Sequence, residues 1–246
     1  MKDFNLIQLD STPSTQNYLV SLCKEAFVDE FTIVSTFDQT AGKGQANHIW
    51  ESEKNKNLSF SILLRPKFVK VQEQFILSKT VSIAITDFLA KYIKDNIFIK
   101  WPNDIYINKN KICGILCQNQ IIGSTLDNVI IGIGININQK KFDFAPNPTS
   151  LAMENGIMYN LNTLLIGLID CIQIRYNQLK KYGRKTIDSE YLQKLLFKNE
   201  FRQYIYLGNK ITAKIINVNS FGHLVLEDKN ANVFSAELRQ LNFQLD

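Results

Sequence analysis

Residues 100–118 read KWPNDIYINKNKICGILCQ, and this stretch decides the fold predicted for the centre of the chain. Proline lacks the backbone N–H that a sheet ladder needs, so Pro102 is expected to end the apolar strand before it. Beyond it, the β-prone run IYI, the turn-forming NKN and the run KICGIL follow in the order of a β-hairpin. Residues 105–116 are therefore predicted to fold back on themselves.

Side-chain direction on the returning strand follows from the two-residue repeat of β-structure. Strict alternation would place Lys111 and Cys113 on one face, and Ile112 and Gly114 on the other. Because Gly114 has no side chain, another group can approach the backbone closely there. The hairpin thus brings together a lysine, an Asn-Asp pair and a bare glycine, which predicts a pocket for an anionic ligand.

The composition indicates a globular protein with one large domain, or one medium-sized domain and a small companion. Hydrophobic residues make up 45% and charged residues 21% of the 246 residues, which are ordinary values for a chain with a real core. The formal charge of +5 is spread along the chain, so it is compatible with anionic substrates and does not require nucleic acid.

Cysteine usage and the absence of targeting segments predict a cytoplasmic protein. The four cysteines form no CxxC pair and the two histidines are far apart, so free thiols are expected rather than a zinc site. The N-terminus has no apolar signal-peptide core. No uninterrupted apolar run reaches the length of about 20 residues that a membrane helix needs, so no membrane span is expected.

Periodicity and breakers predict the other elements. The larger part should contain a helix starting near Ser14, strands at 31–37, 57–64 and 129–137, a helix over 72–92, a short helix after 146–151, and a long helix over 161–182 closed by Gly183. After Arg202 the pattern changes to short strands at 204–207, 211–218, 223–227 and 232–237. This predicts a β-barrel of about 45 residues packed on its neighbour, with domains at 1–200 and 201–246.

The segment QTAGKGQ, residues 39–45, is a glycine-bearing loop after a predicted strand. Two glycines would let backbone amides and Lys43 close over a bound anion. The loop is no dinucleotide fingerprint, since position 47 is Asn, and no Walker-type GK[ST] occurs. A mobile surface loop with no ligand explains the local pattern equally well.

Ordinary structural roles also fit the other candidates. Ser14 and Thr15 could serve only to cap a helix. Trp50 could be a core residue, Asn136 a core amide with its hydrogen bonds satisfied, and Lys111 an exposed hairpin lysine. These alternatives stay open on the local pattern alone.

Several motifs together resemble the biotin protein ligase family. They stand in family order over nearly the whole chain: Ser14-Thr15, Ala41-Gly42-Lys43-Gly44, NLxxSILLRP at 57–66, KWPND followed by Lys111 and Gly114, GIGIN at 132–136, and the β-rich tail. The resemblance implies an α+β fold with a mixed or antiparallel sheet flanked by helices, similar to class II synthetases. It also implies a small C-terminal SH3-like β-barrel.

The resemblance implies an ATP-dependent ligase that forms biotinyl-5′-AMP and then transfers biotin to a lysine of a biotin carboxyl carrier domain. ATP, Mg²⁺ and biotin would be bound, a homodimer is compatible with the family, and neither DNA nor membrane is expected. Lys111 and Lys43 would be catalytic, and Asp104 would hold Mg²⁺. Biotin would contact Ser14, Thr15, Gln16, Gln39, Gly42, Gly44, Gln45, Lys111 and Gly114; ATP would contact Lys43, Trp50, Asn103, Asp104 and Asn136.

The chain departs from the family in the glycine loop, which usually is rich in arginine and has another glycine. Gln45, Ala46, Asn47 and His48 stand at several of those positions. Which group contacts phosphate there, and how firmly an intermediate is held, therefore do not follow from the resemblance.

Three alternatives belong to other classes. Lipoate or octanoate ligases resemble this family in fold, but usually carry an arginine-rich segment with three glycines and lack KWPND. A biotin-sensing repressor would need an N-terminal helix-turn-helix domain, and motifs that begin by Ser14 leave no room for one, so a monofunctional form is expected. A pure ligand-binding module would need none of the phosphate-directed groups.

Overall fold

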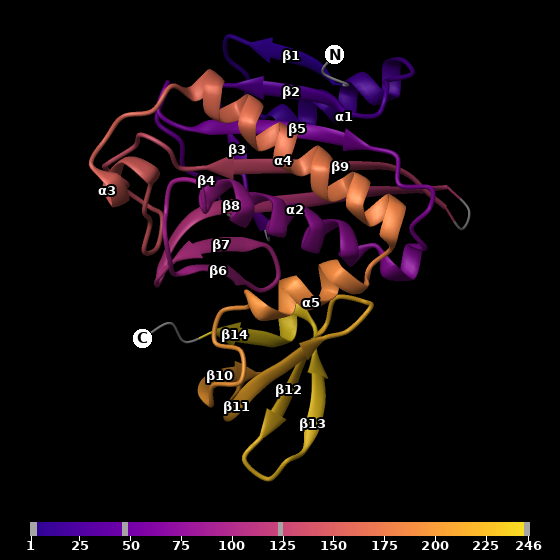
Figure 1. The fold of residues 1–246 in the computed structure, drawn as a ribbon, viewed down its shortest axis with the longest axis vertical. Coiled ribbons are helices and arrows are strands. Elements are labelled where there is room, and N and C mark those ends of the chain that lie inside the picture. The colour runs from indigo at the N-terminus through magenta and orange to yellow at the C-terminus, as the bar shows by residue number, and fades with distance from the viewer. Residues whose placement is uncertain (1–3, 46–48, 123–124, 244–246) are drawn as a thin grey trace.

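The computed structural model describes residues 4–45, 49–122 and 125–243. Within these ranges the chain forms a seven-stranded sheet with helices on both faces, a five-stranded sheet below it, and a two-stranded ribbon (Figure 1). The α+β architecture expected from the resemblance is therefore confirmed. Among the described residues, every helix is too short or too polar to cross a membrane.

The larger sheet is mixed. From one edge to the other its strands are β1 (Asn5–Leu9), β2 (Thr32–Thr36), β5 (Leu58–Leu64), β9 (Thr125–Ile135), β8 (Asn110–Ile122), β7 (Asp104–Ile107) and β6 (Ile97–Lys100). β1 runs parallel to β2, and the other neighbours are antiparallel. β7 and β8 form the hairpin predicted from residues 105–116.

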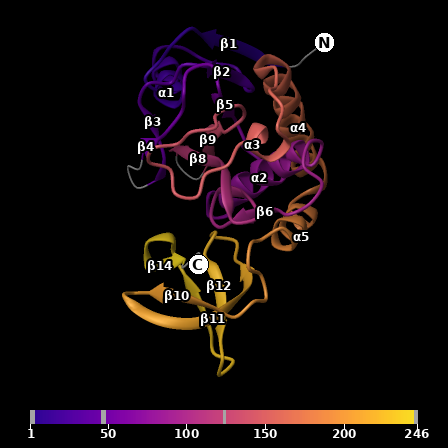
Figure 2. The same ribbon diagram turned by 90° about the vertical axis from the view of Figure 1, so that its left-hand side faces the viewer.

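The two faces of this sheet have different coverings. Figure 2 shows α2 (Phe75–Leu89) and α4 (Leu161–Tyr182) on one side, and α1 (Thr15–Glu25) with the ribbon of β3 (Gly42–Lys43) and β4 (Ile49–Trp50) on the other. Alternation along β5 and β9 sends branched and aromatic side chains into the core under α2. Their intervening residues, Ser59, Ser61, Gly132 and Gly134, face the ribbon side.

The predicted alternation on β8 is wrong at one point. Ile105 pairs with Cys113, but Tyr106 pairs with Lys111, so Ile112 is an extra residue in a β-bulge. The bulge turns Lys111 to the face of Gly114, whereas Cys113 and Ile112 are both buried in the core. Lys111 and Gly114 therefore share a face, because one inserted residue shifts the two-residue repeat.

Helices are found at all four predicted places, whereas the helix α5 (Lys185–Gln193) was not predicted. The long helix spans Leu161–Tyr182 and ends at Gly183, and Ser14 caps α1 by accepting a hydrogen bond from the Asn17 amide at 3.3 Å. The helix expected over 72–92 is shorter, because a 3₁₀ turn, η2 (Val71–Glu73), precedes α2. α3 (Leu151–Asn155) follows the predicted loop, and α5 (Lys185–Gln193) follows α4.

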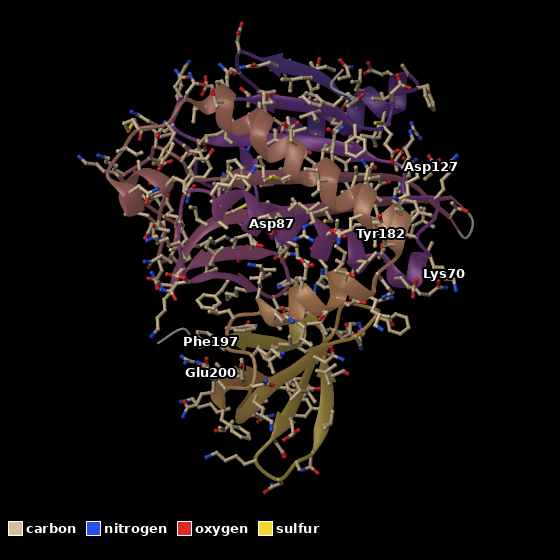
Figure 3. All side chains as sticks on the ribbon, in the orientation of Figure 1. Lys70, Asp87, Asp127, Tyr182, Phe197 and Glu200 are labelled. Atoms are coloured by element: carbon tan, nitrogen blue, oxygen red, sulfur yellow. The ribbon has the colours of Figure 1, made fainter. Side chains whose placement is uncertain are left out.

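The five-stranded sheet is antiparallel, which fits an SH3-like unit. Its order is β13 (Val233–Ala236), β12 (Leu224–Asp228), β11 (Asn209–Val218), β10 (Arg202–Tyr206) and β14 (Leu241–Phe243), with a 3₁₀ turn, η3 (Leu238–Gln240), before β14. β14 and β1 had not been predicted. Phe197 and Glu200 lie in the connection from α5, at the level where the two sheets meet (Figure 3). The domain boundary at 200 stays a prediction.

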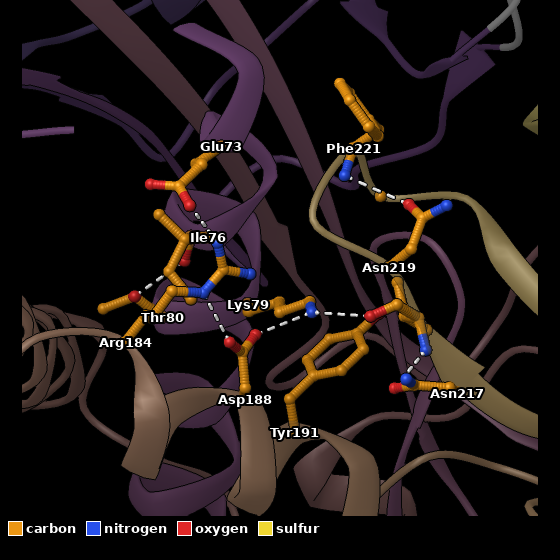
Figure 4. Close-up of polar contacts among 12 residues, drawn as sticks. Glu73, Ile76, Lys79, Thr80, Arg184, Asp188, Tyr191, Asn217, Asn219 and Phe221 are labelled. Carbon is orange, nitrogen blue, oxygen red and sulfur yellow. Dashed lines mark hydrogen bonds and ion pairs between the residues drawn. The ribbon is translucent and has the colours of Figure 1, made fainter. Parts of the chain in front are cut away.

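Buried polar contacts join the smaller sheet to the larger part. Lys79 Nζ of α2 donates to Asp188 Oδ1 of α5 at 2.8 Å and to the Val218 carbonyl of β11 at 3.2 Å (Figure 4). Trp101 Nε1 donates to the Gly222 carbonyl at 2.9 Å. The smaller sheet is thus fastened beside the segment that follows β6.

Candidate active site

A cavity of about 690 Å³ lies on the ribbon face of the larger sheet. Its floor is one cross-strand row, in which β-pairing aligns Lys100, Asp104, Gly114 and Gly134. A second row, two residues further along, consists of Leu116, Gly132 and Ser61. Small residues in the middle of both rows leave room for a ligand to lie against the backbone.

The start of α1 forms one end of the cavity. The Thr15 amide donates to Gln39 Oε1 at 3.0 Å, and the Thr15 hydroxyl lies 2.9 Å from that of Ser61. Gln16 Nε2 donates to the Leu116 carbonyl at 3.2 Å, across the backbone of Gly132. This end therefore presents hydroxyl and amide groups, which suit a polar ring rather than an alkyl tail.

Trp50 lies over the glycine row. Its indole rests on Gly134, where a Cβ would overlap the ring, and a Cβ on Gly114 would come within 3.1 Å of Trp50 Cζ3. The indole N–H is buried and has no hydrogen-bond partner among the described residues. Trp50 is thus a wall of the cavity, and its N–H is available to a ligand.

Lys111 and Asp104 form the charged centre. Lys111 Nζ lies 2.7 Å from Asp104 Oδ1, with 26% and 18% of the two side chains exposed, and 5.8 Å from the centre of the Trp50 ring. Two hydrogen bonds hold the backbone of Lys111 against a neighbouring loop: its N–H donates to the Asn147 carbonyl at 2.7 Å, and its carbonyl accepts from the Thr149 N–H at 2.9 Å. The bulge and these hydrogen bonds position the lysine at the cavity.

The glycine loop contributes a second, exposed cation. Lys43, Gly44 and Gln45 line the cavity, and Lys43 is exposed. Gly42 does not line it but lies behind, where a Cβ would come within 2.8 Å of Gln39 Nε2. The substituted positions 46–48 lie outside the described residues.

The two predicted asparagines are both buried. Asn103 Nδ2 donates to the Ile115 carbonyl, and Asn136 Nδ2 donates to the Thr149 carbonyl at 3.0 Å. Asn136 Oδ1 is buried without a partner in the described part of the chain. Asn136 is therefore only half satisfied as a core amide, and its free oxygen can accept a hydrogen bond from a ligand.

Glu51 was not predicted, and no local signal points to it. Its carboxylate accepts three consecutive backbone N–H groups, from Asp143 at 2.8 Å, Phe144 at 2.9 Å and Ala145 at 3.2 Å. It thereby ties the loop beside Asn136 to the strand of Trp50. Gly132 and Gly134 belong to the GIGIN motif but were not assigned to the site, although their alternate spacing in an apolar strand is a readable sign of a cavity floor.

Thiol and metal chemistry have little support from the residues present. Burial raises the pKa of the Cys113 thiol well above its ordinary value and that of Cys117 to about 12, so neither is a ready nucleophile. In the described ranges, no group of three or more His, Cys, Asp or Glu side chains could hold a metal ion. Of the described carboxylates that line the cavity, Glu51 is occupied by backbone N–H groups and Asp104 lies in the floor, which fits an ion carried by phosphates and not an all-protein metal site.

A family model described as the Biotin/lipoate A/B protein ligase family matches residues 8–136. The bifunctional ligase/repressor BirA of Bacillus spizizenii is 30% identical over 222 residues, which make up 89% of this chain and 65% of that protein. The biotin–[acetyl-CoA-carboxylase] ligase of Mycobacterium tuberculosis is 30% identical over 116 residues, 46% of this chain and 42% of its own length. The chain thus spans less than two thirds of these relatives.

Solved structures match over almost the whole chain. The biotin protein ligase from Aquifex aeolicus in complex with biotin and ATP is similar with a TM-score of 0.79 and 25% identity, covering 97% of both chains. The biotin protein ligase from Leishmania major in complex with biotinyl-5-AMP has a TM-score of 0.65 at 20% identity, covering 95% of this chain and 98% of its own. The second likeness concerns the fold alone.

Proposed function

The chain belongs to the Biotin/lipoate A/B protein ligase family, and from that premise we propose that it ligates biotin to protein. Biotin and ATP would form biotinyl-5′-AMP and pyrophosphate. The biotinyl group would then pass to a lysine of a biotin carboxyl carrier domain. The observation that carries the proposal is the Lys111–Asp104 pair in the floor of a cavity whose other end is lined with hydroxyl and amide groups.

The first step joins two anions. A carboxylate oxygen of biotin attacks the α-phosphorus of ATP, and the bond to the bridging oxygen breaks as pyrophosphate leaves. Lys111 would hold the carboxylate and the α-phosphate together by offsetting their repulsion, and Lys43 would add charge from the glycine loop. Asp104 would keep the Lys111 ammonium aimed into the cavity before the ligands arrive.

In the second step the carrier lysine attacks the acyl carbon, and AMP leaves with the electron pair of the acyl–oxygen bond. Until then the mixed anhydride must be kept from water. Trp50, which lies over the glycine row, and the loop at 39–45, which lines the cavity, would cover it. Lys111 would again stabilise the negative charge on the leaving phosphate.

The polar end of the cavity favours biotin over a fatty acid. The ureido ring of biotin carries two N–H donors and a carbonyl, and Thr15, Gln16 and Gln39 offer matching acceptors and donors. The orphaned oxygen of Asn136 and the N–H of Trp50 lie at the other side and would serve the nucleotide. Mg²⁺, when bound with ATP, would neutralise phosphate charge, with Asp104 as its protein ligand.

The acid that drives ATP–pyrophosphate exchange tests the proposal. The purified chain is incubated with ATP and radiolabelled pyrophosphate, together with biotin, lipoate or octanoate in separate reactions. Exchange only with biotin, followed by a mass increase of an added biotin carboxyl carrier domain, is the expected result. Exchange with lipoate or octanoate would favour that ligase instead, and exchange with none of the three would overturn the proposal.

A further inference from the structure

Glu51 lines the cavity, but neither step of the proposed reaction gives it a role. It directly follows Trp50, the last residue of β4, and it is partly buried. Its two carboxylate oxygens accept the backbone N–H groups of residues 143–145, at 2.8, 2.9 and 3.2 Å. Consecutive backbone N–H groups form nests that bind anions, and here the anion is a side chain of the protein itself.

The buried Gln139 supports this contact from the base of the loop. Its Nε2 donates to the Lys141 carbonyl at 2.8 Å and lies 3.5 Å from Glu51 Oε1. Its Oε1 accepts the Glu53 N–H at 2.9 Å and a hydrogen bond from the Asn57 side chain. Gln139 therefore links the segment that carries Glu51 to the start of the loop, which limits where the carboxylate can lie.

The loop at residues 140–147 forms neither helix nor strand, and hydrogen bonds hold it at three places. Gln139 precedes it, Glu51 holds its middle, and at its end the Asn147 carbonyl accepts the Lys111 N–H. Without the contact to Glu51, the stretch between the two ends could take many conformations. A loop that must become ordered when a ligand binds lowers the affinity for that ligand.

Several side chains of this loop line the cavity beside Asn136, and they are apolar: Phe142, Phe144, Ala145 and Pro146. Phe144 is 84% exposed although it is large and apolar. An exposed aromatic ring at a cavity gains by contact with a flat ligand group, and in a nucleotide that group is the purine ring. The shape of the loop therefore matters for the nucleotide rather than for the acid.

We propose that Glu51 is a positioning residue for the nucleotide: its carboxylate fills the nest at residues 143–145 and keeps the loop in its binding shape before ATP arrives. The inference rests on the proposed function, since ATP is a substrate of that reaction. Apparent affinity follows the fraction of molecules that already have the binding shape. Glu51 thus strengthens ATP binding without touching the reacting atoms.

ATP–pyrophosphate exchange with ATP as the varied substrate tests the proposal. Glu51→Ala should raise the KM for ATP about tenfold, and change the KM for biotin and the maximal rate by less than about threefold. Glu51→Gln keeps one acceptor oxygen and replaces the other with a donor, so its KM for ATP should lie between those of the wild type and Glu51→Ala. The matched control, Glu53→Ala, removes an exposed carboxylate of the same segment and should change none of these values.

Hydrogen exchange of the ligand-free protein measures the loop directly. In Glu51→Ala the amides of residues 143–145 should exchange about tenfold faster or more, and in Glu53→Ala at the wild-type rate. Unchanged amide exchange in Glu51→Ala would overturn the proposal. So would an unchanged KM for ATP, or an equal rise of the KM values for ATP and biotin, which indicates a general defect of the cavity.

Calorimetric titration with ATP separates this inference from the proposed function. If no acid supports exchange, the function fails, but about tenfold weaker ATP binding by Glu51→Ala than by the wild type still supports Glu51 as a positioning residue. Equal binding by the two proteins refutes it, as does a wild-type protein that binds no ATP.

Discussion

Two lysine–aspartate pairs in this protein have nearly the same length and opposite surroundings. Lys111 Nζ lies 2.7 Å from Asp104, and Lys79 Nζ lies 2.8 Å from Asp188. The first pair opens on the cavity. The second is closed at its lysine end: only 3% of the Lys79 side chain is exposed, against 30% of Asp188, and the Lys79 ammonium lies 5.5 Å from the centre of the Tyr191 ring (Figure 4).

Access decides what each pair can do. Burial lowers the pKa of Lys79, and Asp188 counteracts this. Burial alone would raise the pKa of Asp188, but hydrogen bonds from Arg184 and Lys79 hold it below its ordinary value. Because Lys79 donates a second hydrogen bond to the Val218 carbonyl, it is a structural tie between α2, α5 and β11. Lys111, by contrast, keeps an open side on which an anion can bind.

The largest effect is expected when the Lys111–Asp104 pair in the cavity is broken. Lys111→Ala should lower biotin-dependent ATP–pyrophosphate exchange by about 10²–10³-fold, because a group that stabilises charge in the transition state is lost. Its free energy of unfolding should change by less than about 1 kcal/mol, since the pair is partly solvated. The matched control, Lys79→Met, should keep the exchange rate. A similar loss of exchange in both variants would contradict the assignment of Lys111 to the active site and of Lys79 to a structural role.

The next-largest effect is expected when the Lys79–Asp188 pair is broken. Asp188→Ala should lower the free energy of unfolding by about 3 kcal/mol, measured by urea denaturation, because Lys79 is left buried without its carboxylate. The double variant Lys79→Met/Asp188→Ala should regain most of that stability, since the buried charge is removed with its partner. Additive losses in the double variant would show that Asp188 acts through Arg184 alone.

The smallest expected effect is the pH dependence of the stability that Asp188 contributes. The pKa of Asp188 is lower in the folded chain than in the unfolded chain, so its contribution to stability is complete above the unfolded value of about 3.9. It is lost as the pH falls through the folded pKa. The stability advantage of the wild type over Asp188→Asn, from urea midpoints, should be constant between about pH 7 and about pH 5 and shrink below about pH 4. An advantage that grows in acid would reverse the assigned sign.

Local signals predicted the elements that depend on neighbours in sequence. The helix Leu161–Tyr182 could be placed from its apolar periodicity and from Gly183, whose φ of 75° suits a residue without a side chain. The β7–β8 hairpin followed from a turn between two β-prone runs. β1 and β14 were missed because each is short and is stabilised mainly by a partner strand far away in sequence.

The candidate site could be foreseen as a set of residues but not as an arrangement. Ser14, Lys111 and Asn136 were named from motifs, and the cavity brings them together. Their roles stay predictions. Glu51 has no local pattern that marks it, since its role depends on a loop that the fold brings to it.

The sequence by itself determined the polar, glycine-bearing strands and the residue types from which a phosphate-directed site can be built. Only the tertiary structure decided which lysine faces the cavity and which is sealed. The bulge at Ile112 turned Lys111 toward Gly114, and the packing of α5 and β11 closed over Lys79. The residue type sets the charge of a side chain, but the solvent exposure of that charge depends on all the groups packed around it.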